Sequence, residues 1–439
     1  MTRYLSDATL DALRQIGDPD ADALFRPDAM GVALLDQQGY SDRVRDEGFS
    51  KLSDRAELLS AVAGAPVVTN TLTFKQEAPD DDLLDALNVA SMVFQRYGNE
   101  IAAALLLAAL PEAFAAEGGA HVLVKTRNLA TADALPRRIR GTAQFLMLVM
   151  ARDTELLEEE KRWAPIDGRC WRTVVALRLY HASIREHVRA IIETAVAAGA
   201  KAPMAGDAII NQEDLLGMLL GFSIGTLDVL ERFGIRLSDD EKEAYLVAWN
   251  HIGSLLGIGS VTVTSSLKGK AKPTKPTKPP TPLVPANCPD ARRLSAQIRT
   301  RVWPDISALT LEQQLDSTDD GRQLIVAMLE DLRRSMPKFG KKLPQLVMRQ
   351  LVDPRVRDRL ALGEGGLLEL GYGQFLELIK ASPIGRTFDP GTLSGPALRS
   401  AANLVTRNSV ISFLGEGKPP FVIPGLEEWI DAVGSSRRP

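Results

Sequence analysis

The feature that most constrains the fold of this chain is an apolar segment at residues 100–116. It contains the longest uninterrupted apolar run in the sequence, the ten residues from Ile101 to Leu110, which ends at Pro111. A helix that is apolar on every side must be buried inside a larger structure. A helix that spans a bilayer needs about 20 such residues. The segment therefore predicts a buried helix in a bundle, and we expect no transmembrane segment.

Other segments repeat this helical spacing of apolar residues. Asn211 is a suitable N-cap, Gly234 is a suitable stop, and Ser238 with Glu241 forms a capping box before a helix that carries Trp249. Signals typical of strands are short and few, at 66–73 and 260–264. The sequence predicts an all-α protein, a large helical bundle with helices over 81–97, 100–116, 137–150, 171–198, 211–233, 290–302 and 321–336.

Composition excludes several classes of protein. The 52 Lys and Arg residues nearly balance the 56 Asp and Glu residues, for a net charge of -4, which argues against a nucleic-acid partner. Two cysteines are too few for a disulfide scaffold or for a zinc or iron–sulfur site built on cysteine. The first residues lack the basic and apolar regions of a signal peptide, so we expect a cytoplasmic protein.

Residues 268–289 interrupt the helical pattern with five lysines and seven prolines. Repeated Lys-Pro-Thr units favour polyproline II and oppose a packed helix. Composition favours a solvated linker or insertion over a basic tether that docks on a partner.

The chain has only four histidines, and one of them lies on an apolar stripe. On a helix, Val174, Leu177, His181, Ile184 and Val188 share a face, which places His181 near the centre of a buried surface. Such an imidazole is a core histidine bonded to a carbonyl, a buried ion-pair partner, or a ligand to a metal or haem iron. A neighbouring face carries arginines, namely Arg178, Arg185 and Arg189.

A second group of candidates precedes this stripe. At helical spacing Arg138, Thr142, Phe145 and Val149 align, so that a charge and a hydroxyl stand at the head of an apolar face. A desolvated arginine needs a carboxylate, a propionate or another anion. The alternative is that the arginines around Arg138 form a solvated helix start.

The remaining histidines have less distinctive contexts. His121 lies in a short apolar run after a glycine pair. His187 is expected at the surface or boundary of its helix, and His251 in the core or at its boundary.

Several segments in order resemble the haem-dependent oxygenase family of latex-clearing proteins and fungal mpaB-type oxygenases. They cover roughly residues 83–258 and, more weakly, 290–360, and the segments are 118–126, 137–145, 177–185, 211–223, 232–249 and 253–258. The resemblance implies a globin-like core around haem b. It implies that His181, in Arg-Leu-Tyr-His-Ala, is the iron ligand, and that Arg138 and Thr142 lie on the distal side, with Arg138 also steadying a haem propionate.

The sequence departs from the family pattern in two places. Gly141 stands where the family has a distal lysine, and the segment around His121 lacks the family's catalytic carboxylate, so that His121 is a candidate base. The resemblance implies a haem b oxygenase that uses dioxygen to cleave a C=C bond of an apolar isoprenoid or lipid-like substrate. The alternatives are a binding or sensor protein of the same fold without turnover, and a scaffold that acts through its lysine–proline tether.

These patterns together predict three regions. They are an N-terminal helical extension at 1–80, an oxygenase-like helical domain at 81–360 with the insertion at 268–289, and a C-terminal extension at 361–439.

Overall fold

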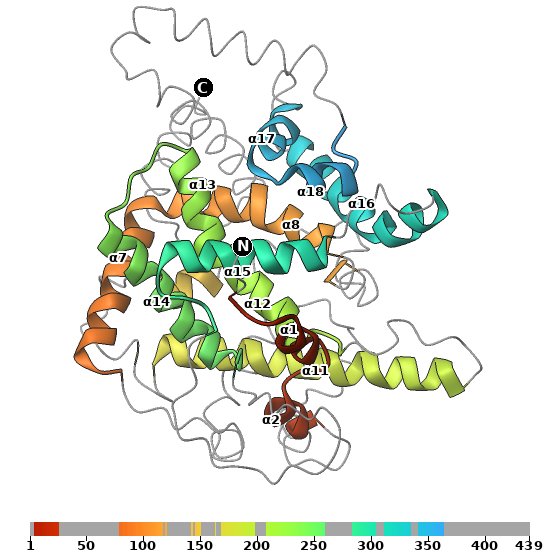
Figure 1. The fold of residues 1–439 in the computed structure, drawn as a ribbon, viewed down its shortest axis with the longest axis horizontal. Coiled ribbons are helices and arrows are strands. Elements are labelled where there is room, and N and C mark those ends of the chain that lie inside the picture. Colours follow the sequence, from red (N-terminus) through yellow and green to blue (C-terminus); the bar gives the residue numbers. More distant parts are fainter. Residues whose placement is uncertain are drawn as a thin grey trace, which may run out of the picture.

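The computed structural model describes residues 4–25, 79–116, 119–120, 142–143, 145–150, 163, 168–197, 208–259, 283–303, 311–334 and 341–363. Every regular element in these ranges is a helix, which confirms the prediction of an all-α fold (Figure 1). The segments at 66–73 and 260–264 lie outside the described residues.

The apolar segment belongs to a long helical stretch, the first rod, which is kinked at Tyr97, where φ is -127° and ψ is 25°. Helix α7 (Asp81–Ala104) continues through a π-helical segment, η3 (Leu105–Ala109), into α8 (Leu110–Ala115). Pro111 lacks an N–H and its ring opposes the carbonyl four residues earlier, which explains the widened turn before it. By length and composition this rod could cross a membrane. Most of its most apolar stretch of 18 residues, however, is buried inside the protein, as in a core helix.

A second rod packs against the first, with a π segment of its own. Helix α12 (Gln212–Leu220) leads through η5 (Gly221–Gly225) into α13 (Thr226–Arg232). The predicted cap is confirmed, because the Asn211 side chain accepts a hydrogen bond from the Asp214 N–H at 2.9 Å. The predicted stop is confirmed too, since Gly234 adopts φ 79°.

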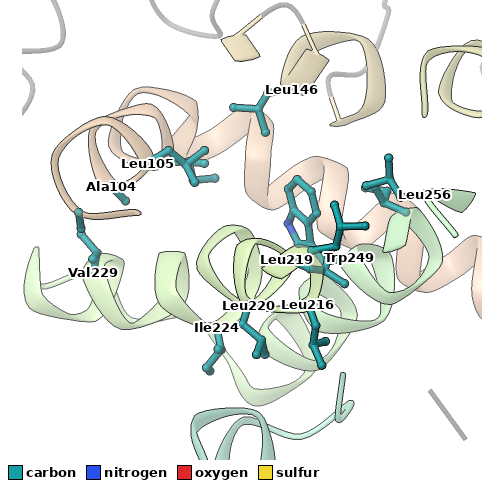
Figure 2. Close-up of a cluster of buried hydrophobic side chains, with 14 of the residues drawn as sticks. Ala104, Leu105, Leu146, Leu216, Leu219, Leu220, Ile224, Val229, Trp249 and Leu256 are labelled. Atoms are coloured by element: carbon teal, nitrogen blue, oxygen red, sulfur yellow. The ribbon is translucent and has the colours of Figure 1, made fainter. Parts of the chain in front are cut away.

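Helix α14 (Asp239–Leu255) lies alongside α7 and closes the core (Figure 1). Its predicted capping box is present, with reciprocal hydrogen bonds between Ser238 and Glu241. Figure 2 shows Trp249 of α14 beside Leu219 of α12 in the apolar cluster. Leu219 packs on Gly253, where a Cβ atom would overlap its methyl group. The bare backbone of Gly253 thus lets α12 and α14 approach closely.

The N-terminal residues pack into this core. Helix α1 (Asp7–Arg14) contacts α12, and α2 (Pro19–Asp22) with the short η1 (Ala23–Phe25) contacts α11 (Arg169–Ala197). Leu10, Leu13, Ala21 and Leu24 are buried in the same apolar cluster as the main helices.

Four further helices complete the described part of the chain. Helix α15 (Cys288–Val302) crosses the middle of Figure 1, and α16 (Leu311–Arg334), α17 (Leu343–Leu351) and α18 (Pro354–Arg359) lie beyond it. The end of the lysine–proline segment belongs to the fold, because Val284 is buried and Pro289 lies in the first turn of α15. Proline is favourable there because the first N–H groups of a helix have no partner within it.

Candidate functional site

His181 lies in the middle of α11 on the predicted stripe, at the edge of the core. Val174 and Ile184 of this stripe are buried, while Leu177, His181 and Val188 are half-buried. The Nδ1 atom of His181 is fully shielded from solvent, and the ring lies 6.4 Å from that of Tyr180. The stripe is therefore a half-buried apolar strip with one imidazole in it.

The more deeply buried side of α11 carries arginines. The Arg178 side chain is only 2% exposed and forms two hydrogen bonds to Asp18 of the N-terminal segment, from Nε to Oδ2 at 2.5 Å and from Nη2 to Oδ1 at 2.8 Å. This two-point pairing compensates the desolvation of both charges.

Arg185 repeats this arrangement two turns later on the same side of α11. Its Nε donates to Oδ1 of Asp22 at 2.7 Å. Burial raises the pKa of Asp22, and the Arg185 guanidinium opposes that shift. Arg178 lies three residues before His181 and Arg185 lies four residues after it. The ion pairs to Asp18 and Asp22 therefore attach the α2 segment to α11 one turn before and one turn after this residue.

The loop after α14 closes over the Arg178–Asp18 pair. Gly257 has φ 79°, and a Cβ atom there would lie 2.6 Å from both Arg178 Nε and Asp18 Oδ2. Glycine is needed at this position both for the left-handed backbone and for the close approach. The pair is thereby sealed between α2, α11 and the end of α14.

Among the predicted distal residues, the structure describes Thr142. It is half-buried in a short helical stretch whose later residues Leu146 and Val149 are buried. Arg169 Nε, at the start of α11, donates to the Leu148 carbonyl at 3.0 Å, which ties this stretch to the helix that carries His181. Arg138 and His121 lie outside the described residues.

The pKa of His251, in α14, is shifted by burial. Burial lowers its pKa to about 4, so that its ring is neutral at physiological pH. The ring packs edge-on against Trp163 with centroids 6.3 Å apart. This environment agrees with the predicted position in the core or at its boundary. The side chain of His187 lies outside the described residues.

Within the described ranges, no three His, Cys, Asp or Glu side chains form a group that could hold a metal ion. On α11 the donor set is one imidazole in an apolar strip. Such a set suits a planar apolar group that takes one protein ligand better than a bare ion that needs three or four.

Sequence reasoning missed Asp18 and Asp22, the partners of the α11 arginines. Both lie about 160 residues earlier in the chain, in a segment without a distinctive motif. The sequence offered one sign of their role: Asp18 and Asp22 are four residues apart, the first just before and the second at the end of the short helix α2, which begins with proline.

By its fold and by the strip on α11, this chain is an all-helical protein that presents a single imidazole on an apolar helix face. The family described as "ER-bound oxygenase mpaB/B'/Rubber oxygenase, catalytic domain" matches residues 97–381, and the chain belongs to this family. The resemblance seen in the sequence is thereby confirmed.

A solved structure shares the fold over nearly the whole chain. It is the latex clearing protein LCP in the closed state, with a TM-score of 0.60 and 17% sequence identity over 94% of each chain. At this identity the likeness shows the helical architecture. The search of curated proteins found no match.

Proposed function

We propose that this protein is a haem b-dependent oxygenase that cleaves a C=C bond of an apolar unsaturated substrate, isoprenoid or lipid-like. The observation that carries the proposal is His181, an imidazole with a solvent-shielded Nδ1 on a half-buried apolar strip, in a member of an oxygenase family. An action in the cytoplasm is part of the same proposal.

The residues of α11 fit a haem group. His181 would be the single protein ligand, and the aliphatic side chains of Leu177 and Val188 beside it offer a half-buried apolar surface to a porphyrin. When bound, haem supplies the activation of dioxygen. The ion pairs of Arg178 and Arg185 with α2 would fix how α11 presents the imidazole.

The other proposed roles belong to side chains on the distal side. Arg138 would steady a propionate through its guanidinium group, and Thr142 would donate a hydrogen bond from its hydroxyl. His121 would accept the proton that leaves the allylic position of the substrate, in place of the carboxylate found in the family. The apolar strip would exclude water and hold the hydrocarbon chain.

The test is the absorption spectrum of the purified protein after haem supplementation. We expect a Soret band in the wild type and its loss in His181→Ala, because the axial ligand is removed. His187→Ala, on the same helix, is the control and should retain the band. A wild type without a Soret band, or a His181→Ala variant that retains haem with an unchanged spectrum, would overturn the proposal.

A second candidate is a haem-containing or haem-free binding or sensor protein of the same fold without turnover. The specific observation is Gly141 at the position of the family's distal lysine, together with the missing carboxylate near His121. Oxygen consumption with a panel of isoprenoids and unsaturated fatty acids separates the candidates. Turnover above the rate of free haem identifies the oxygenase, and binding without turnover identifies the sensor.

A further inference from the structure

A second polar centre lies where the two π-helical segments meet. Gly221 of η5 faces Ala109 of η3, with 3.6 Å between an added Cβ at Gly221 and the Cβ of Ala109. Beside this contact is a partly open cavity of about 200 Å³, lined by both π segments and by residues of α8, α13, α15 and the α17–α18 turn. Its size suits a small ligand, since sites for drug-sized molecules begin at about 300 Å³.

Small residues on the π segments leave this space open. Ala108, Ala109, Gly221 and Gly225 line it, and the Cβ missing from Gly225 would lie 3.9 Å from Arg299 Nη2. A π turn interrupts the regular ladder of helix hydrogen bonds and is frequent at functional sites. Here two such turns from different helices line one cavity.

The carboxylates in the cavity wall are already paired. Glu112 accepts from Arg299 Nη2 at 2.8 Å. The other two carboxylates bind arginines that do not line the cavity, Asp228 to Arg292 at 2.7 Å and Asp353 to Arg355 at 3.1 Å. Each of these carboxylates therefore has an ion-pair partner other than the two remaining lining arginines.

Those remaining arginines, Arg232 and Arg357, have no carboxylate partner among the described residues. Arg232 is an exposed residue that donates from Nη1 to the Leu351 carbonyl at 2.6 Å. Burial raises the pKa of Glu112, and the charge of Arg232 opposes that rise without a direct ion pair. The Nε atom of Arg357 is buried and donates no hydrogen bond within the described part of the chain. A buried guanidinium donor without an acceptor is rare in native proteins, because its desolvation is not repaid.

We propose that this cavity binds a small oxyanion, a phosphate or a small dicarboxylate, held by Arg357 and Arg232. Planar guanidinium groups match the oxygen spacing of carboxylate and phosphate, and two of them favour a doubly charged ligand. The ligand would join α13 to the α17–α18 turn and so secure the C-terminal helices on the bundle. The site lies on α8, α13, α15 and α18, apart from the strip on α11, and the proposal does not depend on haem.

Isothermal titration calorimetry of the full chain tests this, with inorganic phosphate and succinate as separate probes at constant ionic strength. We expect saturable binding of one anion per chain, and the preferred probe assigns the ligand to phosphate or dicarboxylate chemistry. Sodium chloride at the same ionic strength should not compete. If neither anion shows saturable binding at tens of millimolar, the proposal is wrong.

Variants place the binding in this cavity. Arg357→Gln should weaken the preferred anion by about tenfold or more, because a charge-assisted hydrogen bond is lost. Arg357→Lys retains the charge but loses the paired N–H donors of the guanidinium group, so it should bind the anion with intermediate affinity. This variant tests the role of Arg357 if the Gln variant does not fold. Arg293→Gln, on the exposed side of α15 and paired with Asp290, is the control and should bind as the wild type does. Equal affinity in the wild type and both Arg357 variants would overturn the assignment.

Discussion

The pair between Asp18 and Arg178 makes a quantitative prediction about how the N-terminal segment supports α11. Asp18→Asn retains the size of the side chain and an oxygen that can cap α2, but removes the charge that faces the 2%-exposed Arg178. Breaking a buried ion pair on one side costs about 3–5 kcal/mol. Because Asn still accepts one hydrogen bond, we expect a loss near the lower end, about 3 kcal/mol in the free energy of unfolding.

Urea denaturation followed by tryptophan fluorescence measures this loss, as a lower midpoint at an unchanged slope. The matched control is Asp11→Asn, since Asp11 also belongs to the N-terminal segment and contacts an arginine, Arg301, at 2.6 Å. Asp11 is 67% exposed, so its pair contributes about 0–1 kcal/mol.

The double variant Asp18→Asn/Arg178→Met separates loss of the pair from loss of packing. Removing the uncompensated charge should restore much of the stability that Asp18→Asn loses. If Asp18→Asn costs no more than Asp11→Asn, or if the double variant is less stable by the sum of the single losses, the two side chains are not coupled as the structure indicates. A folded Asp18→Asn variant should also retain less haem, because α2 positions α11 around His181.

Three further predictions concern other elements. Gly257→Ala should lower the free energy of unfolding, measured by heat or urea, by about 2 kcal/mol or more, because its Cβ would overlap the ion pair between Asp18 and Arg178. The control is Gly363→Ala, which has φ 74° but a nearest neighbour at 3.6 Å and should cost about 1 kcal/mol. His251 is neutral in the fold, with a pKa of about 4 against 6.5, so the unfolded chain binds a proton first as the pH falls. Between about pH 7.5 and 5.5 the wild type should lose about 1 kcal/mol that His251→Gln does not lose, measured as the difference between their urea midpoints. Ser238→Ala should cost about 1 kcal/mol and Ser238→Asp almost nothing, and a Ser238→Ala variant as stable as the wild type would contradict the role of the capping box.

Features set by neighbouring residues were predictable from the sequence. The cap at Asn211, the stop at Gly234 and the capping box at Ser238 each depend on three to five adjacent residues, and all appear as expected. Apolar periodicity likewise identified the rods around residues 81–115 and 212–232. Local hydrogen bonding and one-sided burial fix these elements, so a short window of sequence contains the information.

Features that depend on distant residues were not predictable. The sequence places His181 near the centre of the buried face of α11, whereas the arginine side is buried more deeply, because Asp18 and Asp22 neutralise it. The π-helical segments could not be predicted from the sequence for a different reason. A π turn adds one residue to a turn, and the run at 100–116 is so uniformly apolar that its periodicity does not register the extra residue.

The buried arginines of α11 and the half-buried Arg357 at the cavity differ in a way that separates structural from ligand-binding roles. On α11, the charges of Arg178 and Arg185 each pair with a carboxylate, from Asp18 before α2 and Asp22 within it, although Nη2 of Arg185 has no hydrogen-bond partner within the described ranges, so a change of charge there acts on the fold. At the cavity beside the π segments, Arg357 is half-buried and has no ion pair among the described residues, and its buried Nε has no acceptor there, so an anion that enters would supply one. Removing a positive charge should therefore affect the stability of the free protein differently at the two places. Arg178→Met destabilises it by leaving Asp18 uncompensated, whereas Arg357→Gln leaves it as stable or more stable and loses only the stabilisation that an added anion provides.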